Sequence, residues 1–411
     1  MSGASSPDAA YLDVGYLDAA ATAPLRPEAL RAMLDVWESG QANASSVHSP
    51  GFRARELVEG ARTRIARALG AMPGEVIFTS GGTEANSLAI VGLALARPRG
   101  RHIVTTAIEH SSVLESCRYL ERVFGFELTV LPVDADGLVD QAAAAQALRP
   151  DTTLVSVGLA NGEIGTVQSL GELADSAREL GVTVHSDAVQ AAASLPVSFG
   201  SSTAPSAAPG APAGVAPDPS AWPGRSVDAI TVASHKFGGP QGVGALIVRG
   251  HLQLESIIHG GGQERGARSG TENVAGIAGF AAAVAVATGQ IGSAALALMD
   301  SRDELIARVL AEVPGAALTG HPSERLPGHA SFTISGVSGE SLLVALDTAG
   351  VAVSSGSACA AGKSEPSPVL LALGLRDELA QTAVRFSLAD PLAPETLDRI
   401  IRVLRSEVLR G

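Results

Sequence analysis

The chain has 411 residues and a formal net charge of −13, so it has no electrostatic attraction to nucleic acid or to an anionic membrane surface. Aromatic residues are only 3% against 46% hydrophobic residues, which predicts a large core of small aliphatic side chains. The N-terminus, MSGASSPDAAYLDVGY, lacks the basic and apolar regions of a signal peptide. The most apolar stretch, residues 277–291, is alanine-rich and too short for a membrane span, so we expect a cytoplasmic protein.

Short apolar runs alternate with helical segments between residues 75 and 249. The runs predict strands at 76–79, 102–106, 128–133, 154–158, 183–186, 229–233 and 244–248. Several are apolar almost throughout, as expected where both faces of a sheet are covered, and the amphipathic segment 170–180 is typical of a covering helix. This alternation predicts an α/β domain around a mostly parallel seven-stranded sheet.

After about residue 275 the pattern changes to that of a smaller α+β unit. We expect an alanine-rich helix and then a second helix over 301–313. The remaining expected strands are 330–334, 351–354 and 383–388, and the remaining expected helices are 340–349, 367–373 and 394–409. The predicted domains are 24–274 for the large unit, and 1–23 with 275–411 for the small one. Residues 200–224, rich in Pro, Ala, Gly and Ser, predict a disordered insertion in the large unit.

The segment TSGGTEANSLAI (79–90) places glycines between a strand and a helix. Gly82 allows the backbone to approach an anion at the helix N-terminus, and Thr83 adds a hydroxyl. An ordinary helix with Thr83 as its N-cap would have the same sequence.

Two further candidates follow strands of the same sheet. Asp187 ends a β-rich run, where a carboxylate could hold a protonated ring nitrogen or simply cap the next helix. Lys236 follows a buried-looking strand, where a desolvated amine could form a Schiff base or the lysine could lie at the surface. An anion cup, a ring-nitrogen carboxylate and a Schiff-base lysine together predict pyridoxal 5'-phosphate as the cofactor.

The smaller unit carries two more candidates. Cys359 follows a strand and precedes a segment rich in Gly, Ser and Pro, which suits a cysteine that moves and reacts. The other cysteine, Cys117, lies in a helical pattern and is expected to be an inert core residue. Arg385 interrupts an apolar strand, where its guanidinium could bind a substrate carboxylate or form a structural salt bridge.

These segments resemble the cysteine desulfurases, a group of fold-type-I pyridoxal-phosphate enzymes in the class V aminotransferase family. The resemblance runs from about residue 16 to the C-terminus and breaks at the insertion. The matching segments are YLDAAATAP (16–24), TSGGTEANSLAI (79–90), EHSSVLESCRYLE (109–121), HSDAVQ (185–190), SHKFGGPQGVGAL (234–246), HGGGQERGARSGT (259–271), SSGSAC (354–359) and DELAQTAVRFSL (377–388).

The resemblance implies the fold of that group and a role for each matching residue. Lys236 resembles the Schiff-base lysine, Gly82 and Thr83 the phosphate cup, Asp187 the partner of the pyridine nitrogen, and Gln190 the glutamine near the ring hydroxyl.

The other matches concern phosphate, substrate and sulfur. His110 resembles the acid–base histidine stacked on the ring, and His235 a phosphate contact. Thr271 resembles a threonine that reaches the phosphate of the neighbouring subunit, which implies a homodimer with shared active sites. Arg385 resembles the substrate-carboxylate clamp, and Cys359 the nucleophile that becomes a persulfide. No resident metal is implied, beyond a transient contact between Cys359 and an iron–sulfur cluster.

The sequence departs from the family pattern at two positions. Gly162 stands where the family has the asparagine that touches the ring hydroxyl, and whether Asn161 replaces it as a cofactor and substrate contact is open. Ala233 stands where the family commonly has a serine, and Ser234, one residue later, is the remaining candidate for that phosphate contact.

The resemblance implies removal of sulfur from L-cysteine, giving L-alanine and a persulfide on Cys359. The acceptor would be an iron–sulfur scaffold protein or a tRNA-thiolation relay. One alternative is a selenocysteine lyase or another β-lyase of the same fold. An alternative of a different class is a non-catalytic sulfur-relay scaffold.

Overall fold

The structure is a computed structural model that describes residues 15–40, 42–200, 227–355 and 366–410. Cys359 and residues 201–224 of the predicted insertion lie outside the described residues.

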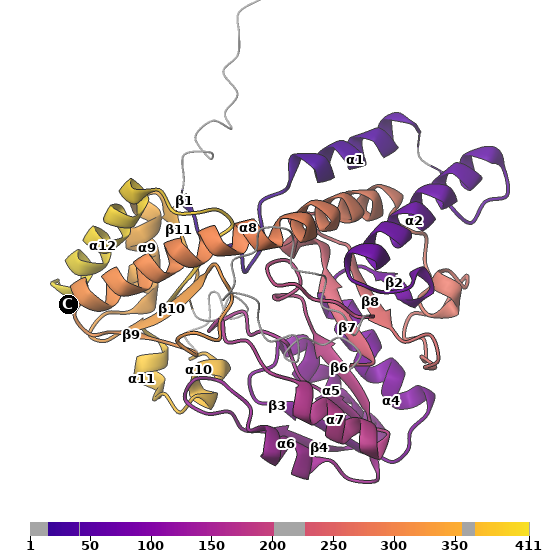
Figure 1. Cartoon of the computed structure of the whole chain (residues 1–411), viewed down its shortest axis with the longest axis horizontal. Coiled ribbons are helices and arrows are strands. Elements are labelled where there is room, and N and C mark those ends of the chain that lie inside the picture. Colours follow the sequence, from indigo (N-terminus) through magenta and orange to yellow (C-terminus); the bar gives the residue numbers. More distant parts are fainter. Residues whose placement is uncertain (1–14, 41, 201–226, 356–365, 411) are drawn as a thin grey trace, which may run out of the picture.

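The larger sheet has seven strands in the order β2-β8-β7-β6-β5-β3-β4 (Figure 1). Its strands are β2 (Val76–Thr79), β3 (His102–Thr106), β4 (Glu127–Leu131), β5 (Thr152–Ser156), β6 (Thr183–Asp187), β7 (Ala229–Ala233) and β8 (Gly244–Val248). Neighbouring strands are parallel except for β8, which runs antiparallel to β2 and to β7. The predicted α/β fold with a mostly parallel seven-stranded sheet is confirmed.

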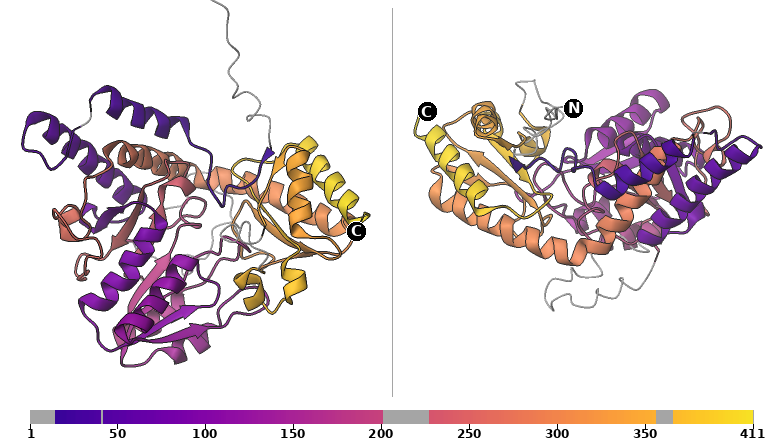
Figure 2. Two further views of the ribbon diagram at one scale, coloured as in Figure 1. Left: turned by 180° about the vertical axis from the view of Figure 1, so that it is seen from behind. Right: turned by 90° about the horizontal axis from the view of Figure 1, so that it is seen from above.

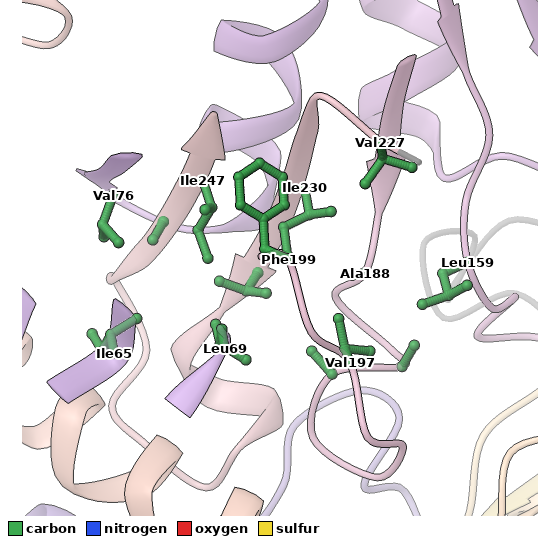
Figure 3. Packing of buried hydrophobic residues seen from close by; sticks show 14 of the residues in the cluster. Ile65, Leu69, Val76, Leu159, Ala188, Val197, Phe199, Val227, Ile230 and Ile247 are labelled. Atoms are coloured by element: carbon green, nitrogen blue, oxygen red, sulfur yellow. The ribbon is translucent and has the colours of Figure 1, made fainter. Parts of the chain in front are cut away.

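Successive residues of each strand point to opposite faces, and both faces are buried. In β2, Val76 and Phe78 join one hydrophobic core while Ile77 joins another. Figure 3 shows the first core, where Phe199 lies among side chains of the sheet and of α2, including Ile65. Helices that cover this face are α2 (Ser49–Ala68), α6 (Gln141–Ala147), α7 (Gly171–Leu180) and part of α8 (Val274–Glu312).

The opposite face is covered by a continuous helical run and by α5 (Ser111–Phe124). The run consists of α3 (Gly82–Ser87), a π-helical turn (Leu88–Gly92) and α4 (Leu93–Ala96). The left-handed residue Gly125 ends α5, which is a conformation that favours glycine. Cys117 faces this core, as predicted, and burial raises the pKa of its thiol to about 12.

One prediction about the helices was wrong. The chain after residue 273 forms a single helix of 39 residues, α8, where two helices were expected. No proline interrupts this segment and alanine has the highest helix propensity, so the helix continues until Pro314 follows it. Figures 1 and 2 show α8 running along the molecule from α1 (Pro27–Glu38) to the smaller sheet.

The length and composition of α8 are also those of a membrane span, contrary to the expectation drawn from the stretch 277–291 alone. However, 56% of its most apolar window is buried inside the fold. Ile277 and Phe280 join the core of the large sheet, while Leu305 and Val309 join the core of the small sheet. Burial against protein on this scale is typical of a core helix.

The smaller sheet is antiparallel, in the order β12-β10-β9, with β9 (Ala316–Leu318), β10 (His329–Ile334) and β12 (Ala383–Ser387). Beside it, β1 (Gly15–Tyr16) pairs in parallel with β11 (Val351–Ala352), which joins the start of the described chain to this unit. The helices of this region are α9 (Gly339–Thr348), α10 (Pro368–Ala372), α11 (Asp377–Ala380) and α12 (Pro394–Val408).

Candidate active site

Most of the sequence-predicted residues of the large unit gather at one edge of the large sheet. Strands β6 and β7 are parallel neighbours, and they end at Asp187 and just before Lys236 respectively. The carboxyl end of β3 leads to His110 at the start of α5, and β2 leads to Gly82 at the start of α3. The carboxyl ends of strands are where open α/β sheets bind ligands.

The carboxylate of Asp187 is held in place by two donors. The backbone N–H of Val189 donates to Oδ1 at 2.9 Å, and Asn86 Nδ2 donates to Oδ2 at 2.7 Å. Asn86 Nδ2 also donates to Ser112 Oγ at 3.0 Å. Sequence reasoning missed Asn86 and Ser112, although both lie in segments that carry the family resemblance.

The same network reaches the imidazole of His110. The backbone N–H of Ser112 donates to Nδ1 at 3.1 Å, and the Ser112 hydroxyl lies 2.7 Å from the same nitrogen. Nδ1 therefore acts as an acceptor, so the ring proton lies on Nε2. His110 is exposed at the surface of the described chain.

A second carboxyl lies buried beneath this network. Glu109 accepts hydrogen bonds from the Thr106 hydroxyl at 2.6 Å and from the backbone N–H of Gly158 at 3.0 Å. Burial, reinforced by the charge of Asp187, raises the pKa of Glu109 to about 7. Sequence reasoning missed Glu109 as well, although it begins the segment 109–121 that carries the family resemblance.

The amine of Lys236 lies against the N-terminal segment. Its Nζ donates to the carbonyl of Ala21 at 2.8 Å and also to the carbonyl of Ala20. Gln190 Nε2 donates to the same Ala20 carbonyl at 3.0 Å. The backbone at residues 20–21 thus brings Lys236 and Gln190 together, although 46 positions separate them in the chain.

His235 lies beside that lysine. Its Nδ1 is 3.2 Å from the hydroxyl of Thr22, and burial together with the charge of Lys236 lowers its pKa to about 4. The imidazole is therefore neutral at physiological pH.

The expected phosphate cup is partly assembled. A Cβ on Gly82 would lie 2.9 Å from Val189 and 3.4 Å from Ala233, so only glycine fits this close approach. Thr83 is exposed in the next position of the helix. Ser234 is fully buried, and its hydroxyl has no hydrogen-bond partner among the described residues.

Thr271 does not lie at a strand end of the large sheet. It is exposed in the loop that precedes α8. Its predicted role at the phosphate of a neighbouring subunit stays a prediction.

Arg385 approaches from the smaller sheet and is 2% exposed. Its Nη2 forms an ion pair with Asp18 at 2.7 Å, and its Nη1 donates to the carbonyl of Gly162 at 2.9 Å. Nε is buried without a hydrogen-bond partner among the described residues. The guanidinium is thus fixed at two nitrogens and retains N–H groups for a further acceptor.

Asn161 supports the adjacent turn. Its Nδ2 donates to the carbonyl of Ile108 at 2.7 Å, and its Oδ1 accepts from the backbone N–H groups of Glu163 and Ile164. Its predicted contacts with cofactor and substrate remain predictions.

Described residues flank both sides of the segment that carries Cys359. Ser354 exchanges backbone hydrogen bonds with Arg385. On the other side, the Ser367 hydroxyl donates to Glu163 at 2.5 Å, and burial raises the pKa of Glu163 to about 7. The described residues on both sides of the Cys359 segment therefore lie beside Arg385 or the turn that contains Gly162.

A cavity of about 320 Å³ lies between residues 19–27, α8 and residues 387–390. Lys236 and Gln190 line it, but Asp187 and His110 do not. Within residues 15–40, 42–200, 227–355 and 366–410, no group of three His, Cys, Asp or Glu side chains is placed to hold a metal ion.

Comparisons with known proteins agree with this arrangement. The family model described as Aminotransferase class-V matches residues 15–204 and 223–400. The chain belongs to the class V aminotransferase family.

Its relatives define the group within that family. The chain is 42% identical to the cysteine desulfurase IscS of Dictyoglomus turgidum, over 95% of this chain and 93% of that protein. It is also 42% identical to an IscS-like cysteine desulfurase of Mycobacterium tuberculosis, over 97% of each chain. A solved NifS-like protein superposes with a TM-score of 0.84 at 30% identity, over 97% of this chain and all of the other. By these similarities the chain is a member of the cysteine desulfurase group.

Proposed function

We propose that this chain is a pyridoxal-phosphate-dependent cysteine desulfurase that moves the sulfur of L-cysteine onto Cys359 and releases L-alanine. The observation that carries the proposal is that Asp187 and Lys236 lie at the carboxyl ends of adjacent parallel strands, with Arg385 fixed beside the same edge. Relatives with this name cover nearly the whole chain. A solved SspA structure, 31% identical to this chain, contains cysteine.

The residues present fit the cofactor. Asp187 offers a carboxylate already oriented by two donors, as a protonated ring nitrogen requires, and Gly82 leaves a side-chain-free approach beside it. Lys236 would hold the cofactor through Nζ, and Thr83, His235 and the helix start would face its phosphate. When bound, pyridoxal phosphate supplies an electron sink for deprotonation at Cα of an amino acid.

The chain's own groups would then carry out binding and proton transfer. Arg385 holds the substrate carboxylate through the N–H groups not used by Asp18 and Gly162. Lys236 Nζ accepts the Cα proton, and the Nε2–H of His110 is available as a proton donor. The Cys359 thiolate attacks the substrate sulfur, so that an S–S bond forms while the C–S bond breaks. The electron pair of the C–S bond remains on carbon, which takes up a proton to become the methyl group of alanine.

The proposal extends to the sulfur acceptor, the cellular location and the oligomeric state. The persulfide sulfur passes to an acceptor protein, either an iron–sulfur scaffold or a tRNA-thiolation relay. The enzyme acts in the cytoplasm as a homodimer in which Thr271 completes the partner's phosphate site. The exposed position of Thr271 supports this last point.

The test is to incubate the purified enzyme with pyridoxal phosphate, L-cysteine and dithiothreitol, and to measure alanine and sulfide. We expect equal amounts of the two products. Cys359→Ser should abolish both, and Lys236→Ala should abolish the visible absorption of the bound cofactor. Alanine formation by Cys359→Ser would contradict the persulfide route. The same assay with L-selenocysteine distinguishes a selenocysteine lyase, which would prefer it strongly and survive Cys359→Ser.

A further inference from the structure

His329 is a buried histidine at the start of β10 that the proposed chemistry does not use. It is 2% exposed, and its Nε2 lies 3.1 Å from the carbonyl oxygen of Gly162. A carbonyl oxygen can only accept, so Nε2 carries the proton and Nδ1 does not. Nδ1 has no hydrogen-bond partner among the described residues. The bond to Gly162 is therefore the polar interaction that orients the ring.

The acceptor of that bond also holds Arg385. The carbonyl oxygen of Gly162 accepts a hydrogen bond from Nη1 of Arg385 at 2.9 Å and another from Nε2 of His329. These two bonds use both lone pairs of the oxygen. On the other side of the guanidinium, Asp18 binds Nη2 at 2.7 Å. The peptide at Gly162 is thus one of two supports that aim the guanidinium.

The charge state of His329 suits this position. Burial first, and then the positive charges of Arg385 and Arg325, lower the pKa of His329 to about 3. The ring is therefore neutral at physiological pH, and it fixes the Gly162 carbonyl without placing a second cation beside Arg385. A lysine or a charged histidine at this position would repel the guanidinium.

Residue 162 is a glycine, and Gln190 occupies the space that a side chain there would need. A Cβ there would lie 2.7 Å from Gln190 Nε2 and 2.9 Å from Gln190 Cδ. Gln190 fills this space and bonds Ala20. Residue 162 has no side chain of its own to hold this peptide, which is held instead by the two bonds to its carbonyl and by the bond from the N–H of Glu163 to Asn161 Oδ1.

We infer that His329 is a positioning residue for the substrate carboxylate, acting through the Gly162 carbonyl on the guanidinium of Arg385. This rests on the proposed function, in which Arg385 binds that carboxylate. The inference predicts a selective effect: loss of the His329 donor weakens ligands that carry a carboxylate and spares ligands that lack one.

The main experiment uses the cofactor-loaded enzyme with two ligands, L-alanine and cysteamine, of which only alanine has a carboxylate. Binding is followed by the change in visible absorption of the cofactor. In His329→Asn the amide nitrogen stops near the position of Nδ1, short of the Gly162 carbonyl. We expect the alanine dissociation constant to rise about tenfold, as for one lost hydrogen bond, and cysteamine binding to change less than about twofold. The KM for L-cysteine should rise with it, while kcat stays within about twofold.

Three further variants make the result specific. His329→Gln places its amide nitrogen near the position of Nε2 and should recover most of the alanine affinity. His329→Leu is a second donor-free variant with the same expected loss, so the test does not depend on the folding of one protein. His102→Asn is the matched control, because His102 is a buried histidine of β3 that bonds Thr129 and Thr152, outside the site. It should leave the ratio of the two affinities as in the wild type.

Equal alanine binding by the wild type and both donor-free variants would overturn the inference. A parallel loss of alanine and cysteamine binding would overturn it too, because that result indicates general disruption of the site. These outcomes are distinct from failure of the proposed function, which would appear as a wild-type enzyme that releases no alanine or sulfide from L-cysteine.

Discussion

Asn86 and Asp187, 101 positions apart in the chain, are joined by a 2.7 Å hydrogen bond at the carboxyl edge of the large sheet. The bond fixes one oxygen of the carboxylate while the backbone of Val189 fixes the other. A carboxylate held in this way can keep one orientation toward a cationic ring nitrogen, which a freely rotating one would not.

Asn86→Ala should therefore weaken cofactor binding. The change removes the side-chain donor to Asp187, and a hydrogen bond to a charged group contributes about 1.5–3 kcal/mol, so we expect the pyridoxal-phosphate dissociation constant to rise at least tenfold. The measurement is fluorescence titration of the apoenzyme with the cofactor. Asn273→Ala is the matched control, since that asparagine caps α8 and does not touch Asp187. Unchanged affinity in Asn86→Ala would show that Val189 alone suffices.

Glu109 should make the enzyme less stable as the pH rises. Its pKa is about 7 in the folded protein and 4.5 in the unfolded chain. Between these two pH values the folded state therefore keeps a proton that the unfolded state has lost. The stabilisation is fully present below pH 4.5 and is lost as the pH rises through about 7, by about 3 kcal/mol at most. Glu163 also has a pKa of about 7, so it too should lower the free energy of unfolding as the pH rises.

The check on Glu109 is urea unfolding at several pH values between 4.5 and 8. Glu109→Gln cannot ionise, so its free energy of unfolding should fall less steeply with pH than that of the wild type. Identical slopes for the two proteins would mean that Glu109 titrates near its ordinary value. Asp134→Asn, a change in an exposed loop, provides the control for a lost carboxylate.

Glu264→Gln should cost the fold about 3 kcal/mol or more, because it leaves a buried guanidinium without its main counterion. Glu264 and Arg62 form a bidentate pair at 2.7 and 2.9 Å, and their side chains are 3% and 4% exposed. Glu115→Gln removes a comparable pair with Arg118 whose side chains are more than half exposed, so it should cost less than about 1 kcal/mol. Urea unfolding at pH 7.5 compares the two, and similar losses would contradict the distinction.

Gly289→Ala should stabilise the protein by about 0.5–1 kcal/mol. The position is exposed in the interior of α8, and a Cβ there has nothing within 4 Å, so alanine gains helix propensity without a clash. Gly279→Ala in the same helix is the matched contrast. Its Cβ would lie 2.7 Å from Met33 Cγ and 3.2 Å from the carbonyl of Ala29, so it should destabilise. The difference in melting temperature between the two variants is the measurement, and a shift of equal sign in both would refute the argument.

The sequence predicted the large sheet well because its strands are buried on both faces and appear as continuous apolar runs. Four of them, β2, β3, β7 and β8, have the predicted bounds, and the ends of the others shift by at most two residues. The length of α8 was missed because the polar stretch near residue 301 resembles a break between two helices. In the structure this stretch lies within one helix, whose first half packs on the core of the large sheet and whose second half packs on the core of the small sheet.

The candidate site was predictable to the extent that its residues lie in short motifs. Lys236, Asp187 and Gln190 follow strands and appear in chain order, so motif reading finds them. Asn86, Glu109 and His329 act through contacts made by packing of distant segments, and an asparagine or histidine inside an apolar pattern does not reveal its partner. Gly162 was noted only as a departure, and its fit against Gln190 is a three-dimensional property.

The continuity of α8 has a thermodynamic consequence. Its first half contributes Phe280 to one core and its second half contributes Leu305 to the other. Melting either half would strip apolar cover from its own sheet and leave the remaining helical turns with a frayed end. Denaturation should therefore occur as a single transition, with the calorimetric and van't Hoff enthalpies in agreement, even though the two larger sheets of the described residues have separate cores.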